Sequence, residues 1–297
     1  MKSVQARRRA FKVLFYMGNT AIALIFVSPL LWMIASAFKP EGQIFSQLNS
    51  IKTFIPWDAS FHNFAEVFQR VPMMRYITNS LFYVTVIVVL DLAVNSLCGY
   101  ALAKFDFMGK EFLLSLVISL MVLPNEAVML PLYKLVSSFG WINQWPALIV
   151  PFVAKCFSIY MFRQFFLDIP DELIEAAKID GCSPFGIFTK VVAPISGNVY
   201  ATVFILDYVS HWNDFMWPML AVTGESKRTI QLGIQTFFGL KPINYGPIMA
   251  SLTISAIPMI ILFLFLQKYY VQGISTTGIK GEIQHRSCFC KWPGAFD

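Results

Sequence analysis

Residues 76–103 read YITNSLFYVTVIVVLDLAVNSLCGYALA, and this stretch decides the fold. It contains one charged side chain, Asp91, in an otherwise uncharged run. A helix of about 20 apolar residues crosses the roughly 30 Å hydrocarbon core of a bilayer, whereas a transmembrane strand needs only about 10 residues of alternating polarity. The length and the uniformly apolar character of this run therefore predict a transmembrane α-helix.

Other segments of the chain meet or approach the same length and are equally poor in charge. They are residues 13–38, 112–133, 144–162, 199–220 and 247–267. Segment 199–220 is the least apolar, because it contains Asp207, His211 and Asp214. The sequence thus predicts an all-α polytopic membrane protein, with six transmembrane helices in a single domain over residues 1–281.

The composition of the 297 residues agrees with this prediction. Hydrophobic residues make up 57% and charged residues 13%, against about 25% charged residues in soluble domains. Disordered, collagen-like and coiled-coil proteins are excluded by the same figures. The cysteines do not indicate a disulfide framework: Cys98, Cys156 and Cys182 lie in or beside apolar runs, and Cys288 and Cys290 have too few neighbouring ligands for a zinc site.

The first apolar run could be a cleaved signal peptide or a retained helix. Arginines 7–9 precede it, and residues 35–37 (A-S-A) resemble a cleavage site. The apolar core of a signal peptide is about 7–15 residues long, and this run is longer, which favours a retained transmembrane helix.

The distribution of Lys and Arg predicts the orientation. With six spans and a cytoplasmic N-terminus, the inside segments hold more of these residues than the outside segments, although Lys227 and Arg228 fall outside. Both termini are therefore expected in the cytoplasm. The net charge of +6 is then explained by topology and by attraction to anionic membrane lipid, so no nucleic-acid partner is needed.

One inside loop, residues 168–194, has the signals of two short helices. Asp168 is the expected N-cap of the first, with Pro170 in its first turn and Asp171 near the positive end of the helix dipole. Gly181 is expected to end this helix, and Ser183 is expected to cap the second. Two predicted faces at helical spacing are Leu173, Ala176 and Ala177 in the first helix and Phe185, Phe188 and Val192 in the second.

These residues leave two interpretations open. The hairpin lies at the membrane surface and either seals the helix bundle or forms a docking surface for a cytoplasmic partner. The small side chains of Ala176 and Ala177 would allow another surface to approach closely.

The same loop resembles the EAA loop of binding-protein-dependent ABC importer permeases. The pattern is Glu175-Ala176-Ala177, then Gly181 after three residues, then residues 191–194 (V-V-A-P), with Val191 and Ala193 in place of Ile and Leu. Other motifs similar to the carbohydrate branch of this family are Asp180, residues 169–173, Pro124, residues 131–133, 163–165, 212–215 and 269–273. The resemblance covers about residues 10–281, and the chain is similar to the maltose-type second permease subunit.

The resemblance implies a multi-pass subunit of the bacterial inner membrane that imports a sugar. It implies a homologous second permease, two cytoplasmic ATPase subunits that bind the ATP and Mg²⁺, and a periplasmic solute-binding protein. Contact with the ATPase would fall to Glu175, Ala176, Ala177, Asp180, Gly181 and Pro194. No cofactor or metal is expected on this chain, and it is not expected to be an enzyme, because the phosphate-binding pattern G-x-x-x-x-G-K-[ST] does not occur.

Ionisable residues inside a membrane are candidates for function. Asp207, His211 and Asp214 share one helix face at i, i+4 and i+7; with Trp212 and Asn213 they are candidates for a sugar path or gate. Helix-packing hydrogen bonds and interfacial aromatic residues are the alternative interpretation.

Three more ionisable residues fall within predicted spans. Asp91 is expected to make a hydrogen bond inside the bundle rather than to contact substrate. Glu126 follows Pro124, where the helix is expected to break, and a Glu126–Lys155 ion pair is a further, weaker expectation.

A stand-alone secondary transporter or channel is the alternative function, and ATP-independent transport would distinguish it. A purely structural scaffold does not explain the polar span 199–220. Residues 282–297 follow no family pattern and are predicted to be a disordered, dispensable tail.

Overall fold

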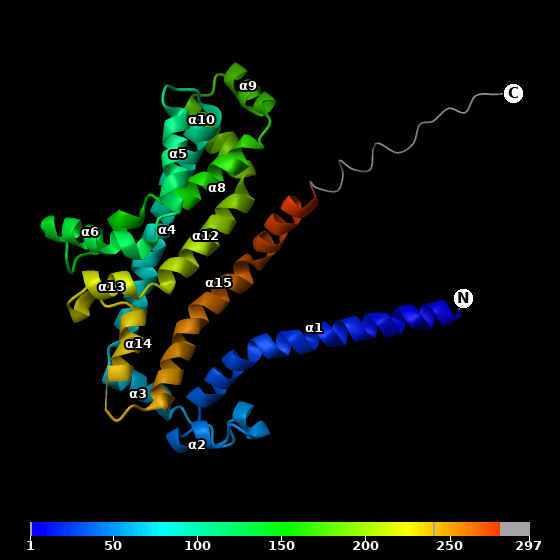
Figure 1. Ribbon diagram of the computed structural model, residues 1–297, viewed down its shortest axis with the longest axis vertical. Coiled ribbons are helices and arrows are strands. Elements are labelled where there is room, and N and C mark those ends of the chain that lie inside the picture. The colour runs from blue at the N-terminus through cyan, green and yellow to red at the C-terminus, as the bar shows by residue number, and fades with distance from the viewer. Residues whose placement is uncertain (1, 240, 280–297) are drawn as a thin grey trace. The chain divides into compact units, whose positions relative to one another are not determined.

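The computed structural model describes residues 2–239 and 241–279 (Figure 1). The predicted tail at 282–297 lies outside this range. Within the described residues every regular element is a helix. The chain forms two compact units: unit 1 combines the residues up to Ile77 with Leu232–Pro258, and unit 2 contains Thr78–Gln231 and the described residues after Pro258.

Unit 1 contains α1 (Lys2–Ala37), α2 (Glu41–Ser46), η1 (Ile51–Phe54), α3 (His62–Arg70) and the first part of α15 (Tyr245–Ile279). Buried polar side chains hold the loops after α1 in place. The Lys39 ammonium donates to the carbonyl oxygens of Lys52 (2.6 Å) and Thr53 (3.0 Å). The Glu41 carboxylate accepts from the backbone N–H groups of Tyr245 (2.9 Å) and Gly246 (2.8 Å), and so caps the N-terminus of α15.

Unit 2 is built around α4 (Met73–Lys104), most of which belongs to it. The elements that follow α4 in unit 2 are α5 (Lys110–Met121), α6 (Asn125–Ser138), α7 (Trp145–Ile149), η2 (Val150–Phe152), α8 (Cys156–Leu167), α12 (Gly197–Trp212), α13 (Met216–Ala221) and η4 (Glu225–Lys227). Helix α14 (Ile230–Gly239) begins in unit 2, but its residues from Leu232 onward belong to unit 1. The segment between α8 and α12 is described below. Helix α4 lies very close to α8 at Gly99, where an added Cβ would lie 2.7 Å from Phe162 Cβ, so glycine is required there.

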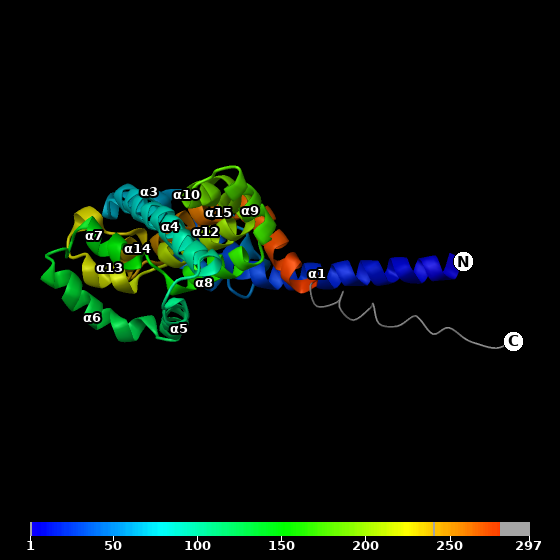
Figure 2. The ribbon, with the colours of Figure 1, turned by 90° about the horizontal axis from the view of Figure 1, so that it is seen from above.

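By length and composition, four to six apolar segments among the described residues could cross a membrane. Four helical segments are long and apolar enough to cross alone: Phe11–Ala37, Met73–Lys104, Trp145–Leu167 and Tyr245–Gln267. Two further candidates are pairs bent at a break, α5 with α6 (105°) and residues 184–195 with α12 (79°). The expected break at Pro124 is confirmed, because α5 ends at Met121 and α6 begins at Asn125. Figure 2 shows α5 and α6 along one edge of unit 2.

The predicted span at 199–220 is too long. Helix α12 ends at Trp212, and α13 begins only at Met216. The polar residues between them end the helix: Asn213 Nδ2 donates back to the Val209 carbonyl oxygen (2.9 Å), and Asp214 Oδ1 accepts from the Trp217 N–H (3.3 Å). Side chains of this type compete with the helical backbone for hydrogen bonds, which the hydrophobicity count did not take into account.

Candidate functional site

The loop at 168–194 folds as a helical hairpin, defined here as residues 171–195. Its first helix, α9 (Asp171–Ile179), begins directly after Pro170. The prediction that Asp168 is its N-cap is wrong, because Asp168 lies at the C-terminal end of α8. Asp171 and Glu172 occupy the first turn of α9, where the helix dipole favours negative charge.

Gly181 makes the turn of the hairpin. Its φ angle is +78°, a left-handed conformation that glycine adopts without steric cost. The Gly181 N–H donates to the Lys178 carbonyl oxygen (3.0 Å), and the Cys182 N–H donates to the Ala177 carbonyl oxygen (3.0 Å). These two bonds form a Schellman motif, so the predicted stop at Gly181 is confirmed.

The second half of the hairpin contains α10 (Pro184–Ile187), the π-helical turn η3 (Phe188–Val192) and α11 (Ala193–Ile195). The predicted cap is confirmed, because Ser183 Oγ accepts from the Gly186 N–H (3.1 Å). Pro194 lies inside α11, next to the 79° bend that leads into α12.

The buried faces of the hairpin differ from the predicted ones. In α9, Ile174 and Ala177 are buried, whereas Leu173 is 46% exposed and Ala176 is exposed. In the second half Phe188 and Val192 are buried as expected, but Phe185 is 64% exposed. The apolar spacing of α9 fits two neighbouring faces of the helix, and packing selects the one centred on Ile174 and Ala177.

The outer face of α9 is therefore both apolar and acidic. Glu175 and Ala176 are exposed, and Ile179, one turn after Glu175, is 87% exposed. A group of large apolar side chains that face outward usually marks a surface that a partner covers. This face has the residue types that a protein partner would cover.

A buried apolar cluster holds the inner face of the hairpin. It joins residues of α4, α8, α9, α10, η3 and α12, among them Tyr100, Phe166, Ile174 and Val192. The Tyr100 ring lies 5.3 Å from the Phe188 ring and 6.3 Å from the Phe166 ring, measured between centroids. Figure 1 shows α9 and α10 together at one end of unit 2. The hairpin is thus packed onto three long helices.

A second feature is a polar cluster of five residues, of which Asp91, Asn95, Ser158 and Asp207 are buried and Lys155 is partly exposed. Asp207 is fully buried; it is paired with the Lys155 ammonium and accepts from Ser158 Oγ (3.0 Å). The Glu126–Lys155 pair is therefore wrong: the cation pairs with α12, and Glu126 is exposed at the start of α6.

The same cluster provides hydrogen-bond partners for the backbone at a break inside the candidate span Trp145–Leu167. Residues 153–155 separate η2 from α8 and are not helical. Asn95 of α4 donates to the Val153 carbonyl oxygen (3.1 Å) and accepts from the Lys155 N–H (3.2 Å). Asn95 also donates to Asp91 (2.6 Å), so the expected hydrogen bond of Asp91 inside the bundle is confirmed. Irregular backbone at membrane depth is tolerated only where such groups satisfy it.

Sequence reasoning missed Asn95 and Ser158, although a signal existed. Asn95 lies one helical turn after Asp91 and faces the same side of α4. A polar residue at this spacing from an intramembrane carboxylate could have been identified as its partner.

The candidate path residues occupy different environments. Asp207, His211 and Trp212 are buried, Asp214 is half-buried and Asn213 is exposed. The His211 carbonyl oxygen accepts from the Tyr83 hydroxyl (2.6 Å). The structure brings Asp207 and His211 together on the interior of unit 2, and it places Asn213 and Asp214 in the break between α12 and α13.

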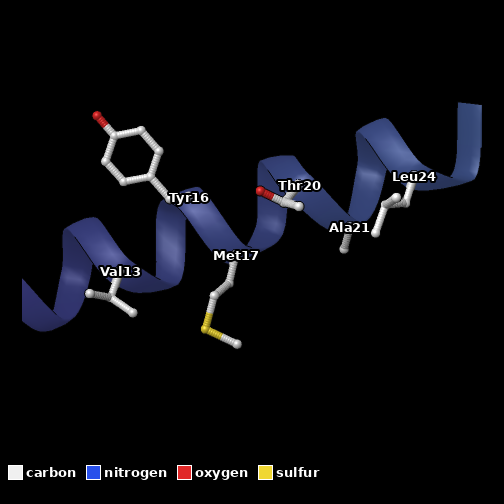
Figure 3. A pocket seen from close by; sticks show the side chains of 6 residues that line it. All are labelled: Val13, Tyr16, Met17, Thr20, Ala21 and Leu24. Atoms are coloured by element: carbon white, nitrogen blue, oxygen red, sulfur yellow. The ribbon is translucent and has the colours of Figure 1, made fainter. Parts of the chain in front are cut away.

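Two further features of the described residues do not form a site. A shallow recess on α1 is lined by residues of that one helix, among them Tyr16, Met17 and Leu24 (Figure 3), and it has no charged side chain. Among the described residues no group of three or more His, Cys, Asp or Glu side chains could hold a metal ion.

The helical fold and the sequence of this chain are both similar to those of known transport proteins. A solved structure of the same fold is a bacterial ABC transporter involved in the import of the acidic polysaccharide alginate; the TM-score is 0.77 at 22% identity, over 88% of this chain and 97% of that one. Residues 95–276 match the family described as "Binding-protein-dependent transport system inner membrane component", and the chain belongs to this family.

Similar curated proteins are sugar-transport permeases. The chain is 35% identical to the arabinooligosaccharides transport system permease protein AraQ of Halalkalibacterium halodurans, over 90% of this chain and 96% of that protein. It is 28% identical to the trehalose/maltose transport system permease protein MalG of Thermococcus litoralis, over 91% and 98%. The resemblance inferred from the EAA pattern is confirmed at the level of the family.

Proposed function

We propose that this chain is one of two permease subunits of an ATP-driven importer of mono- or oligosaccharides in the bacterial inner membrane. It forms half of the translocation path and links closure of the ATPases to alternating access through the hairpin. The relatives whose names specify oligosaccharide transport support the substrate class.

The observation that carries this proposal is the two-sided hairpin. Its inner face is buried against α4, α8 and α12, and its outer face presents Glu175, Ala176 and Ile179. A partner that binds the outer face can therefore displace the hairpin. The contacts of the inner face then pass this movement to α4, α8 and α12. Asp180 and Gly181 form the turn between the two halves of the hairpin. Pro194 lies where the hairpin joins α12.

The proposed partners follow from the family and from uncovered surfaces. No residue of α5 is fully buried, and most of its residues are exposed, so it has a free face for the second permease or for lipid. The ATP and Mg²⁺ belong to two cytoplasmic ATPase subunits, and a periplasmic solute-binding protein delivers the sugar. Both chain termini lie in the cytoplasm in this arrangement.

For the sugar path we propose the segment around the end of α12. Asn213 and Asp214 interrupt the helix and remain accessible in part, so they can offer amide and carboxylate groups to sugar hydroxyls. Trp212, His211 and Asp207 lie behind them and hold the shape of this segment through buried contacts.

Reconstitution tests the proposal. The chain is assembled in liposomes with a second permease, an ATPase and a solute-binding protein of its own organism, and ATP hydrolysis and uptake are measured over a panel of radiolabelled sugars. We expect one sugar class, presented by its binding protein, to stimulate ATP hydrolysis and to enter only when ATP is present. Uptake by the chain alone, without ATPase subunits, would instead establish a stand-alone transporter.

A further inference from the structure

Lys104, the last residue of α4, is a buried cation at the base of the hairpin. Its side chain is only 8% exposed. The ammonium donates to the Ile169 carbonyl oxygen (2.7 Å) and to Asp171 Oδ1 (2.7 Å). Counting Lys and Arg residues assigns this lysine to membrane orientation, but a lysine that served only that purpose would remain in water.

A neighbouring lysine shows the difference. Asp171 is 76% exposed, so exposure of the carboxylate does not set its pair with Lys104 apart. Lys110, whose side chain is 17% exposed, pairs at 3.2 Å with the fully exposed Asp106 in the connection before α5. That pair joins two residues of one short connection, whereas the Lys104 contacts join α4 to a segment more than sixty residues later in the chain. Of these two lysines, only Lys104 links α4 to the start of the hairpin.

The two acceptors of Lys104 define the point where the hairpin begins. Ile169 is buried in the apolar cluster beneath the hairpin, and Asp171 is the first residue of α9. No side chain caps the α9 N-terminus at Pro170. The hydrogen bond from Lys104 and its charge lower the pKa of the Asp171 carboxyl, so this ion pair is lost only as the pH falls through that lowered value.

Tyr100 lies one turn before Lys104 on the same face of α4 and packs against Phe166 and Phe188. Apolar contacts of this kind are non-directional and tolerate sliding. The two charge-assisted hydrogen bonds of Lys104 are directional. The acceptor on Ile169 is a backbone carbonyl oxygen of a buried residue, so this bond in particular fixes the register of the two elements.

We infer that Lys104 is a positioning residue that locks the start of the hairpin to the end of α4, so that movement of the hairpin is transmitted to this helix. The inference rests on the proposed function, since it names the contact that links the hairpin, as the site of ATPase binding, to a membrane helix.

The first test measures coupling in the reconstituted complex as the number of sugar molecules imported per ATP hydrolysed. We expect Lys104→Met to lower this ratio by about tenfold or more, because both charge-assisted hydrogen bonds are lost and one such bond alone corresponds to about a factor of ten. Lys104→Arg should restore most of it. Asp171→Asn should have a smaller effect, because the bond to the Ile169 carbonyl oxygen remains. Lys110→Met is the matched control and should leave the ratio unchanged.

The second test measures directly whether Lys104 holds the start of the hairpin to the end of α4. Spin labels are placed at Met108 and Glu172, both exposed, in an otherwise cysteine-free full chain within the complex, and their distance distribution is recorded. Lys104→Met should broaden this distribution, and Lys110→Met should not. If Lys104→Met does not assemble, Asp171→Asn decides by the same two measurements.

A wild-type coupling ratio together with an unchanged distance distribution in Lys104→Met, or in Asp171→Asn where that variant decides, would overturn the inference. If the wild-type complex shows no ATP-driven uptake at all, the proposed function fails instead. The distance measurement alone then decides whether Lys104 holds the hairpin to α4.

Discussion

Gly181 has a backbone conformation that a residue with a side chain adopts only at a cost. The left-handed region costs an L-residue about 1–2 kcal/mol, and proline cannot reach a φ of +78° at all. We expect Gly181→Ala to loosen the hairpin turn and Gly181→Pro to abolish it, with sugar uptake falling far more than ATP hydrolysis in the reconstituted complex.

The matched control for Gly181 is Gly197→Ala. Gly197 has no atom within 4 Å of an added Cβ, and its φ lies outside the left-handed region. This variant should transport like the wild type. Wild-type uptake by Gly181→Pro would mean that the turn has no part in coupling.

The charges of Lys155 and Asp207 are expected to depend on each other. Asp207 is fully buried, so Lys155→Met leaves a carboxylate without its cation, a change that costs on the order of 3 kcal/mol. Thermal unfolding of the purified chain in detergent should show a clear loss of stability for Lys155→Met and a much smaller one for the double variant Lys155→Met/Asp207→Leu.

Lys110→Met again supplies the comparison, because its pair with the exposed Asp106 should contribute less than about 1 kcal/mol. Equal destabilisation by Lys155→Met and by the double variant would show that the two charges do not interact.

At the scale of single residues, local chemistry was predictable and long-range pairing was not. The turn at Gly181 depends on the absence of a Cβ and the cap at Ser183 on its own hydroxyl, so both are local features, and both predictions are confirmed. The partner of Lys155 could not be identified, because depth along a helix does not say which neighbouring helix a residue faces.

At the scale of elements, the break before α8 depends on one side chain of another helix. Asn95 satisfies the Val153 carbonyl oxygen and the Lys155 N–H, and each buried backbone group left without a partner costs about 1–3 kcal/mol. We expect Asn95→Leu to destabilise this segment, so that hydrogen exchange of the amides around residues 153–156 becomes faster.

Leu97→Ala is the matched change on α4, because Leu97 is 40% exposed and lies two residues from Asn95. It should leave exchange at the break unchanged. Unchanged exchange in Asn95→Leu would show that the break is held by other contacts.

The elements also show why some predicted boundaries and faces were wrong. Hydrophobicity merged α12 and α13 into one span, because a sliding count of apolar residues does not weigh the helix-ending bonds of Asn213 and Asp214. In α9 the alanines lie at the edge of two overlapping apolar faces, and only contact with the cluster beneath the hairpin determines which face is buried. Pro124, by contrast, breaks its helix by its own covalent geometry.

At the scale of the whole molecule, two sets of contacts within unit 2 bear on the number of membrane crossings. Lys104 contacts Asp171, and Asn143 contacts the loop after α13 through the Ala221 carbonyl oxygen, the Gly224 N–H and the Lys227 ammonium. Residues in contact at helix ends lie on the same side of the membrane, so the chain between them crosses an even number of times.

Between Lys104 and Asp171 lie the α5–α6 pair and the span Trp145–Leu167. An even count requires the bent α5–α6 pair to cross once. Between Asn143 and Gly224 lie the same span and the bent pair that contains α12, so this pair must also cross once. With both bent pairs added to the four long helical segments, we predict six spans, with the hairpin on the same side as residues 105–109.

This count gives the last prediction, which single-cysteine labelling of intact cells can check. Cysteines are introduced one at a time at the exposed positions Met108, Ser138, Glu172 and Glu225, in a cysteine-free chain, and treated with a membrane-impermeant maleimide. Positions 138 and 225 should react from outside, and positions 108 and 172 only after the cells are permeabilised, which is also the control for reactivity. The reverse pattern at all four positions would overturn the orientation, whereas different sidedness of 108 and 172, which the Lys104–Asp171 contact forbids, would overturn the six crossings.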